Sequence, residues 1–359
     1  MNMEFNLKEA KNKVLCADSR DILPSMPSES IDLVITSPPY FNQRKYDNSG
    51  KDNKSISDKN TKDLIIGNES SVDKYIENMI SIFKECVRVT KKTGSIVFNL
   101  GDKYENGSLL LIPYRFALEA IKIENVKLIN EVTWVKLNPA PKQSPKKLIP
   151  SKEPFFIFTK SSDYYFDKNA FLDLLDIMNQ NKPSKFSGSL GKKYYNLIEK
   201  SDLTEEQKLK ARHELDKVIK EVKTGKISGF RMKIRGIHSL PYGGNDGGRL
   251  MHIERDGFTI IKISGNALKR DIIESPVETL KGNIHPAVYP EFIIREFIKL
   301  LTKKGDLILD PFIGSGTTGI AAKKLERDYI GIELSQMYRD YAQDRIDKTK
   351  IDKNIDSFL

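Results

Sequence analysis

Short apolar runs alternate with amphipathic stretches along the first half of the chain. The runs are typical of strands buried on both faces of a sheet, and they occupy residues 14–16, 31–35, 95–100, 131–135 and 155–158. Apolar residues at helical spacing predict one helix that ends before Gly94, with Tyr75, Met79, Ile82, Phe83 and Cys86 on its buried face, and a second helix at residues 111–123. This alternation predicts an α/β fold with a doubly wound, mostly parallel sheet and helices on both faces.

The same alternation returns near the end of the chain, after Gly282. Helices are predicted at residues 291–302 and 317–325, and strands at residues 307–310 and 329–333. We therefore expect that a single sheet is built from both ends of the chain.

The middle of the chain lacks this alternation. Residues 199–226 form a highly charged helical pattern, and glycines interspersed with basic residues follow at positions 229, 236, 243, 244, 247 and 248. We expect an inserted recognition region at residues 171–274, which separates two halves of one core, residues 1–170 and 275–359. Residues 46–61 contain almost no apolar side chains, so we also expect a mobile loop within residues 41–72.

The amino-acid composition indicates a globular protein and argues against membrane, disulfide-rich and zinc-binding classes. The 359 residues are 39% hydrophobic and 30% charged, which is typical of a soluble globular protein. No apolar run reaches the length of about eighteen residues that a membrane span needs, and the polar N-terminus does not resemble a secretory signal. Two cysteines, Cys16 and Cys86, are too few for a disulfide framework or a four-ligand zinc site, so no metal is predicted and a reducing cytoplasm is expected.

Basic residues outnumber acidic ones. Lys and Arg total 59 against 49 Asp and Glu, which gives a formal charge of +10. Such an excess attracts polyanions, but it is equally compatible with a generally lysine-rich proteome. Only together with the motifs described next does it favour nucleic acid as the partner.

The predicted strand at residues 307–310 leads into a glycine turn, residues 310–318, with the sequence DPFIGSGTT. Gly314, Gly316 and Gly319 give the spacing G-x-G-x-x-G, which lets backbone N–H groups at a helix N-terminus approach an anionic ligand. Glu333 ends the next predicted strand, where a carboxylate accepts hydrogen bonds from ribose hydroxyls. The pattern predicts a nucleoside cofactor, and by itself it fits an NAD-binding protein nearly as well.

A second turn, Thr36-Ser37-Pro38-Pro39-Tyr40, directly follows the apolar run at residues 31–35. Its two prolines fix φ and present backbone carbonyls with little freedom to relax. A hydroxyl, a rigid carbonyl and an aromatic ring suit the binding of a planar amino group. Residues 37–40 are called the Ser-Pro-Pro-Tyr turn below.

The two turns together resemble the S-adenosylmethionine-dependent DNA amino-methyltransferases, which methylate the exocyclic nitrogen of cytosine or adenine. Their order, with the Ser-Pro-Pro-Tyr turn first and the glycine turn last, is similar to the permuted beta class of that family. The resemblance implies a class I methyltransferase fold, S-adenosylmethionine as cofactor and double-stranded DNA as substrate. The resemblance does not extend to residues 171–274, the candidate target-recognition region.

For catalysis the resemblance implies Ser37, Pro38, Pro39 and Tyr40. The Ser37 hydroxyl and the Pro38 carbonyl are expected to accept the two N–H hydrogens of a base flipped out of the duplex, and Tyr40 is expected to stack on its ring. Serine at the first position of the turn resembles the N4-cytosine enzymes more often than the N6-adenine enzymes. Cytosine N4 is therefore the favoured target, with adenine N6 as the alternative.

Other chemistries are less favoured. Methylation of cytosine at C5 needs a cysteine nucleophile and is excluded, since Cys16 and Cys86 are both expected to pack in the core. Methylation of RNA or of a protein amide stays an alternative, because related Asn-Pro-Pro-Tyr turns methylate a protein glutamine. A non-catalytic reader of nucleic acid on the same fold is a further alternative.

Cofactor contacts are implied at both ends of the chain. Asp18 matches the position that approaches the adenine amino group, although it is also placed to cap the following helix. Residues 285–290 are similar to the motif near the methionine end of the cofactor. The expected cofactor-binding residues are Asp18, His285, Pro286, Asp310, Pro311, Phe312, Gly314, Ser315, Gly316, Thr317, Thr318 and Glu333.

Basic and amide side chains near the Ser-Pro-Pro-Tyr turn and in the middle region are expected to contact DNA. They are Arg44, Lys45, Lys136, Asn138, Lys142, Arg231, Arg235 and Arg249. Trp134 is expected to pack in the sheet. The resemblance further implies a cytoplasmic restriction–modification system with a cognate endonuclease, and a monomer or homodimer.

Overall fold

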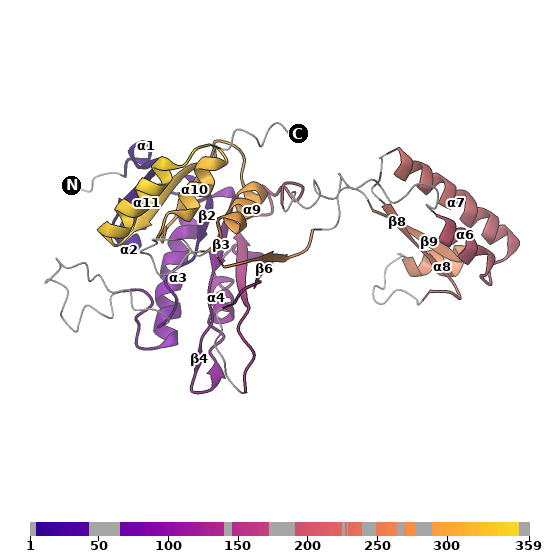
Figure 1. The fold of residues 1–359 in the computed structure, drawn as a ribbon, viewed down its shortest axis with the longest axis horizontal. Helices are drawn as coiled ribbons and strands as arrows, with labels where there is room; N and C mark the ends of the chain where they lie inside the picture. Colours follow the sequence, from indigo (N-terminus) through magenta and orange to yellow (C-terminus); the bar gives the residue numbers. More distant parts are fainter. Residues whose placement is uncertain are drawn as a thin grey trace. The chain divides into compact units, whose positions relative to one another are not determined.

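The chain folds into two compact units, each described here by itself. One unit contains Met1–Phe171 and Arg270–Leu359, and the other contains Leu172–Lys269. The computed structural model describes residues 5–42, 65–139, 146–171, 191–224, 227, 229–238, 249–263, 269–277 and 289–351. Elements from the beginning of the chain, in indigo and purple, and from its end, in orange and yellow, share the first unit (Figure 1).

An eight-stranded sheet forms the centre of the first unit, in the order β1-β12-β11-β2-β3-β7-β6-β10. Its strands are β1 (Lys13–Cys16), β2 (Ile31–Thr36), β3 (Thr90–Asn99), β6 (Lys127–Lys136), β7 (Lys152–Thr159), β10 (Ile272–Ser275), β11 (Leu307–Asp310) and β12 (Asp328–Glu333). Strand β7 is antiparallel to both of its neighbours, β3 and β6, and the other neighbours in the sheet pair in parallel. The predicted single, mostly parallel sheet is confirmed.

Helices cover both faces of this sheet, because the side chains of each buried strand alternate between the faces. Phe156 and Phe158 of β7 belong to the core that contains helices α3 and α4, where the Phe83 and Phe158 rings lie 4.9 Å apart. Phe155 points to the other face, 4.9 Å from the ring of Phe297 in α9. The helices of this unit are α1 (Leu7–Ala10), α2 (Ser19–Ile22), the 3-10 helix η1 (Leu23–Ser25), α3 (Val72–Val89), α4 (Ile112–Ala120), α9 (Glu291–Leu301), α10 (Thr317–Lys324) and α11 (Gln336–Lys348).

Two details of the first unit differ from the prediction. Strand β3 begins at Thr90, so that Gly94 lies inside a strand and does not end a helix. A side chain at Gly94 would collide with the Asp32 carbonyl of the neighbouring strand, and glycine therefore permits this close approach. In the loop expected to be mobile, residues 65–71 are packed, with Ile66 and Glu69 both buried.

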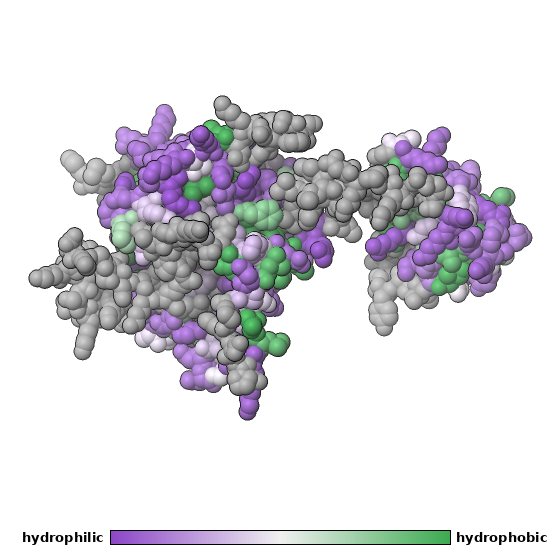
Figure 2. Space-filling view, viewed as in Figure 1, coloured by the Kyte–Doolittle hydropathy of each residue, from purple (hydrophilic) through white to green (hydrophobic). Residues whose placement is uncertain are grey.

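The second unit contains helices and a hairpin around its own small core. Its elements are α6 (Lys192–Glu199), α7 (Glu205–Lys223), β8 (Gly229–Ile234), α8 (Arg249–Asp256) and β9 (Phe258–Ile263). Strands β8 and β9 are antiparallel, and Ile198, Leu215 and Met232 are among the core residues. The charged helical pattern predicted at residues 199–226 corresponds to α7, which is separate from α6. Helix α7 begins after Thr204, because Thr204 and Gln207 form a capping box. Hydrophilic residues, in purple, cover much of the described surface of this unit (Figure 2).

None of the helices in the described ranges is both long enough and apolar enough to cross a membrane.

Candidate active site

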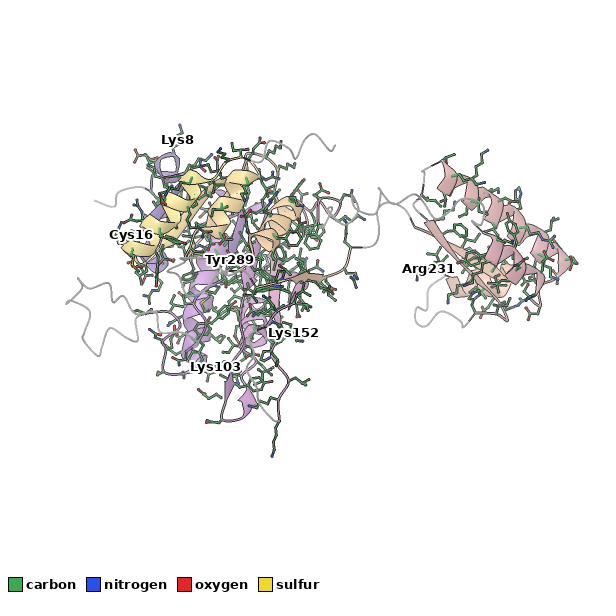
Figure 3. All side chains as sticks on the ribbon, in the orientation of Figure 1. Lys8, Cys16, Lys103, Lys152, Arg231 and Tyr289 are labelled. Atoms are coloured by element: carbon green, nitrogen blue, oxygen red, sulfur yellow. The ribbon has the colours of Figure 1, made fainter. Side chains whose placement is uncertain are left out.

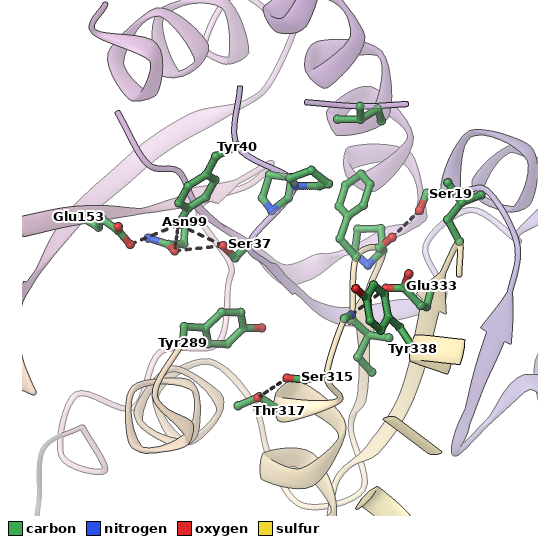
Figure 4. A pocket seen from close by; sticks show the side chains of 18 of the residues that line it. Ser19, Ser37, Tyr40, Asn99, Glu153, Tyr289, Ser315, Thr317, Glu333 and Tyr338 are labelled. Atoms are coloured by element: carbon green, nitrogen blue, oxygen red, sulfur yellow. Dashed lines mark hydrogen bonds between the residues drawn. The ribbon is translucent and has the colours of Figure 1, made fainter. Parts of the chain in front are cut away.

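The Ser-Pro-Pro-Tyr turn and the glycine turn line one cavity of about 890 Å³ in the first unit. The two turns follow β2 and β11, which are parallel neighbours in the sheet, so that both turns emerge at the same sheet edge. Ser37 and Tyr40 lie on one side of the cavity, and Ser19, Glu333 and Tyr338 lie on the other (Figure 4). Two segments far apart in the sequence thus form adjoining halves of one site.

The Ser-Pro-Pro-Tyr turn is held from behind by α3 and by residues 65–71. The Tyr75 hydroxyl of α3 donates a hydrogen bond of 2.9 Å to the Pro39 carbonyl. Gly67, with φ of +96°, packs against Pro39, and its carbonyl accepts a 2.7 Å hydrogen bond from the Asn42 N–H. These contacts fix the Pro39 backbone, so the turn presents its side chains to the cavity in one arrangement.

Asn99, at the end of β3, accepts hydrogen bonds from both hydroxyl groups of the turn. Its Oδ1 accepts hydrogen bonds from Ser37 Oγ at 3.2 Å and from the Tyr40 hydroxyl at 2.7 Å. Its Nδ2 donates to the Pro154 carbonyl at 3.0 Å, and because a carbonyl only accepts, this contact fixes the orientation of the amide. Asn99 was not among the site residues predicted from the sequence. The available signal was a polar residue at the carboxyl end of an apolar strand.

Glu153, near the start of β7, extends the same network. Its Oε2 accepts a hydrogen bond from the Tyr40 hydroxyl at 3.2 Å, and its Oε1 accepts one from the ammonium of Lys136. Lys136 was expected to contact DNA. Its ammonium is instead engaged by Glu153 at the wall of the cavity, because the pairing of β6 with β7 brings their side chains together. Glu153 was also missed from the sequence.

The Tyr40 ring has room only because residue 101 is glycine. A methyl group placed on Gly101 would overlap Cδ2 and Cε2 of the ring and would lie 3.1 Å from Cζ. Gly101 is buried and its φ is not in the left-handed region, so close approach of the ring, and not backbone conformation, requires glycine here.

The glycine turn connects β11 to the N-terminus of α10. Gly314 and Gly316 have φ of +53° and +86°, a conformation that favours glycine. The Gly314 N–H donates to Glu333 Oε2 at 3.1 Å, and the Ser335 N–H donates to Glu333 Oε1 at 2.9 Å. Gly319 lies away from the cavity lining and packs against Ile346 of α11. The G-x-G-x-x-G spacing therefore serves both the turn and the packing of two helices.

Two carboxylates reach the glycine-turn half of the cavity. Burial raises the pKa of Glu333 despite the backbone N–H groups of Ser335, Gly314 and Leu334, which stabilise its charge. Burial also acts to raise the pKa of Asp18, but hydrogen bonds from Arg20 outweigh it and hold that pKa below its ordinary value. Asp18 lines the cavity and also caps α2 through the Arg20 N–H at 2.8 Å, so the geometry combines the two interpretations of this residue.

Asp310 lies beneath the cavity and does not line it. It is 1% exposed and accepts hydrogen bonds of 2.6 Å from both Thr36 Oγ1 and Thr318 Oγ1. Burial raises the pKa of Asp310 against these hydrogen bonds. Since Thr36 directly precedes Ser37, Asp310 braces the two turns against each other. A direct cofactor contact was expected for Asp310 and Thr318, but the geometry gives them this supporting position.

Tyr289 lies between the two halves of the cavity (Figure 4). Its hydroxyl is 2.5 Å from Thr318 Oγ1 and 3.2 Å from Asp310 Oδ2. Burial, with the nearby Asp310 charge, raises the pKa of Tyr289 well above its usual range. Tyr289 was not among the predicted site residues, although it lies in the segment at residues 285–290 that resembles a family motif.

The predicted cofactor-binding residues therefore divide into three groups. Three of them, Asp310, Gly316 and Thr318, do not line the cavity. Two others, His285 and Pro286, lie outside the described residues. Those that line the cavity are Asp18, Pro311, Phe312, Gly314, Ser315, Thr317 and Glu333.

Comparison with known proteins identifies the family. Residues 31–344 match the family profile N6_N4_Mtase, described as DNA methylase. The chain belongs to this DNA methylase family. The predicted resemblance to DNA amino-methyltransferases is thereby confirmed, and with it S-adenosylmethionine as the cofactor.

Relatives of this methylase match it over most of their length. The Type II methyltransferase M.SmaI of Serratia marcescens is 22% identical over 373 residues, which cover 96% of this chain and 93% of that protein. M.BglII of Bacillus subtilis is 28% identical over 337 residues, which cover 93% of this chain and 69% of that protein.

Solved structures share the fold of this methylase. The PvuII DNA methyltransferase (cytosine-N4-specific) has a TM-score of 0.54 at 17% sequence identity, and the match covers 94% of this chain and 90% of that one. TTHA0409 of Thermus thermophilus, complexed with S-adenosyl-L-methionine, has a TM-score of 0.50 at 17% identity, and the match covers 94% and 93%. The predicted class I methyltransferase fold is confirmed.

The residues expected to bind DNA are distributed over both units of the methylase. Asn138 lines the cavity, and its Oδ1 accepts a 2.6 Å hydrogen bond from the Val277 N–H. Arg231 is exposed on β8 of the second unit (Figure 3), whereas Arg235 hydrogen-bonds within that unit to Gln207 Oε1 at 3.3 Å. Outside the described residues lie Arg44, Lys45, Lys142 and the side chain of Arg249.

The two cysteines of the methylase differ in burial. Cys86 is fully buried on α3, and burial raises the pKa of its thiol, as expected for a core residue. Cys16 was also expected in the core, but it is exposed at the end of β1, 3.7 Å from the Leu334 carbonyl. Neither residue lines the cavity of the candidate site.

Proposed function

We propose that this methylase transfers a methyl group from S-adenosylmethionine to the exocyclic amino group of a base flipped out of double-stranded DNA, with N4 of cytosine as the favoured target. The single observation that carries the proposal is that the Ser-Pro-Pro-Tyr turn and the glycine turn line one cavity. Extrusion of the base costs a few kcal/mol, which contacts in the pocket must offset.

The glycine-turn half of the cavity suits S-adenosylmethionine chemically. Asp18 and Glu333 are hydrogen-bond acceptors for an adenine amino group and for ribose hydroxyls, and Phe312 and Tyr338 supply aromatic surface beside them. Glu333 uses one backbone N–H on each of its oxygens, which leaves lone pairs on both. The cofactor, when bound, supplies an electrophilic methyl group.

The hydrogen-bond network sets the direction of the Ser37 hydroxyl. Asn99 Oδ1 and the Glu153 oxygens accept in this network, whereas Ser37 and Tyr40 each carry one hydroxyl hydrogen. The hydrogens of both hydroxyls are directed into the network, so the Ser37 oxygen is left with lone pairs toward the cavity. Those lone pairs accept one N–H of the target amine, and the rigid Pro38 carbonyl accepts the other.

Acceptors at both N–H groups favour a pyramidal nitrogen and aim its lone pair at the methyl carbon. Bound S-adenosylmethionine would supply the methyl group with cleavage of its methyl C–S bond and release of the neutral thioether. The amine nitrogen that accepts the methyl group would become positively charged, and loss of one proton would restore neutrality. Within the described part of the chain, the recorded hydrogen-bond partners of the Ser37 side chain are an amide and a phenol, and neither is a strong base at neutral pH. The proton therefore leaves after transfer, to water by way of the Ser37 oxygen.

The choice of cytosine rests on serine at the first position of the Ser-Pro-Pro-Tyr turn. The PvuII methyltransferase, which is named as cytosine-N4-specific, has the same fold and is consistent with that choice. Adenine N6 is the alternative, because its amino group is also planar and presents two N–H donors. Hydrolysis of methylated DNA to deoxynucleosides separates them: N4-methyl-2′-deoxycytidine supports the proposal, and N6-methyl-2′-deoxyadenosine as the sole product refutes the choice of base.

The setting belongs to the same proposal. The relatives named above are Type II methyltransferases, which supports a restriction–modification role with a cognate endonuclease. A cytoplasmic location and target recognition by residues 171–274 are parts of the same proposal. Sequencing the modified positions in DNA from cells that express this chain tests base, site and strand together. Unmodified DNA, with label from the methyl donor found on RNA or protein, would contradict the proposal.

A further inference from the structure

A small hairpin stands at the mouth of the cavity, on the side of the Ser-Pro-Pro-Tyr turn. It consists of β4 (Tyr104–Glu105) and β5 (Ser108–Leu109), joined by Asn106 and Gly107. Both connecting residues have positive φ, +47° and +86°, as a two-residue turn that matches the strand twist requires. The Asn-Gly sequence thus fixes the register of the hairpin.

That register places two apolar side chains on one face. Tyr104 pairs with Leu109, and Glu105 pairs with Ser108 on the opposite face. Tyr104 is 42% exposed and Leu109 is 39% exposed, yet both line the cavity. An exposed aromatic side chain and an exposed aliphatic side chain at the cavity form a surface suited to a planar apolar ligand face.

Lysines surround this apolar pair. Lys103 and Lys152 line the cavity (Figure 3). The ammonium of Lys147 lies 4.3 Å from the centre of the Tyr104 ring. None of these three lysines is ion-paired with a carboxylate in the described ranges, in contrast to Lys136 with Glu153. Cations without carboxylate partners beside an exposed aromatic ring are the combination that binds nucleic-acid strands.

We propose that this hairpin and its lysines form a clamp for the extruded nucleotide. Tyr104 and Leu109 provide the outer apolar wall against the nucleotide, and Lys103, Lys147 and Lys152 hold the phosphates on either side of it. The assignment rests on the proposed function, since it assumes a flipped DNA base in the cavity. In this proposal the β4–β5 hairpin holds the nucleotide from the mouth of the cavity, which neither the Ser-Pro-Pro-Tyr turn nor the glycine turn does.

The apolar wall is tested by Tyr104→Ala, with Tyr104→Phe as the matched control that keeps the ring. The substrate is a duplex that contains the site found by sequencing modified DNA. Loss of one base–aromatic contact should lower kcat/KM for DNA about 5- to 150-fold, whereas Tyr104→Phe should stay within about threefold of the wild type. Because Tyr104 lies outside the cofactor half, the dissociation constant for S-adenosylmethionine should not change.

The lysines are tested by the salt dependence of binding to the same site-containing duplex, because only a duplex with an extruded nucleotide presents the phosphates on either side of it. Lys103→Gln and Lys147→Gln should each reduce the slope of log K against log salt by about 0.9, the contribution of one phosphate contact. Lys348→Gln is the control, because Lys348 is a surface lysine that is paired with Asp344 at 2.7 Å on α11. Its slope should equal that of the wild type.

The outcomes separate this inference from the proposed function. A wild-type protein that methylates no DNA refutes the proposed function. Wild-type methylation combined with an unchanged kcat/KM in Tyr104→Ala overturns the wall, and unchanged salt slopes overturn the phosphate contacts. Equal losses of DNA turnover and of cofactor affinity in Tyr104→Ala would also overturn the clamp, because they indicate a general distortion of the cavity.

Discussion

Replacement of Gly101 by alanine provides a sharp test of how the Tyr40 ring is positioned. The added methyl group would overlap two ring atoms, so the ring must move by about 1 Å to regain ordinary contact. The Tyr40 hydroxyl donates to Asn99 at 2.7 Å, and a movement of that size breaks or badly lengthens this hydrogen bond. A misplacement of about 1 Å at a reacting centre costs about 100-fold in rate.

We therefore expect Gly101→Ala to lower the single-turnover rate of methyl transfer about 100-fold. Overpacking should also reduce the free energy of unfolding, by about 1–3 kcal/mol. Binding of S-adenosylmethionine, measured by calorimetry, should be nearly unchanged, because Gly101 does not line the cofactor half of the cavity. That measurement also serves as the control for correct folding.

A double-mutant cycle shows whether the effect passes through the ring. In the background of Tyr40→Ala the methyl group at residue 101 has no ring to displace. The double variant should then transfer methyl groups no more slowly than Tyr40→Ala alone. Fully additive losses, or a Gly101→Ala variant with the wild-type rate, would refute the assigned position of Tyr40.

Three further changes test other parts of the site. Asn99→Leu removes the acceptor that directs the Ser-Pro-Pro-Tyr hydroxyls and should lower kcat about 100-fold or more with little change in KM for DNA; an unchanged kcat contradicts the network. Burial raises the pKa of Glu333, so its carboxylate takes up a proton at a higher pH than an ordinary glutamate. Affinity for S-adenosylmethionine should weaken as pH falls through that raised pKa, and titration calorimetry should find no such dependence in Glu333→Gln. Gly316 has φ of +86°, and a Cβ at this position would lie 3.0 Å from the Ala342 carbonyl oxygen. Gly316→Ala should therefore reduce the free energy of unfolding by about 1–3 kcal/mol. The reduction should be smaller in the control Gly305→Ala, where φ is similar but the space around the Cβ is open.

Local patterns in the sequence determined the elements of the core and the two turns. Apolar runs identified β2 and β11, because a strand buried on both faces is apolar throughout. The Gly314 and Gly316 positions followed from turn chemistry, which depends on a few consecutive residues. The family resemblance could be stated from these segments alone, since each motif is short and complete in itself.

Tertiary structure alone decided which polar groups meet the two turns. Asn99 reaches Ser37 because β3 lies beside β2, and its amide is fixed by Pro154 because β7 pairs with β3. Lys136 contacts Glu153 through the pairing of β6 with β7, which no local pattern encodes.

Burial also separated residues that look alike in the sequence. Asp310 and Glu333 each end a strand of the glycine-turn half, but Asp310 turns beneath the cavity to meet Thr36, while Glu333 faces into it. A sequence records which side chains are available at a strand end. Whether each one points into a pocket or under it depends on neighbouring strands and helices, whose contacts join residues that are far apart along the chain.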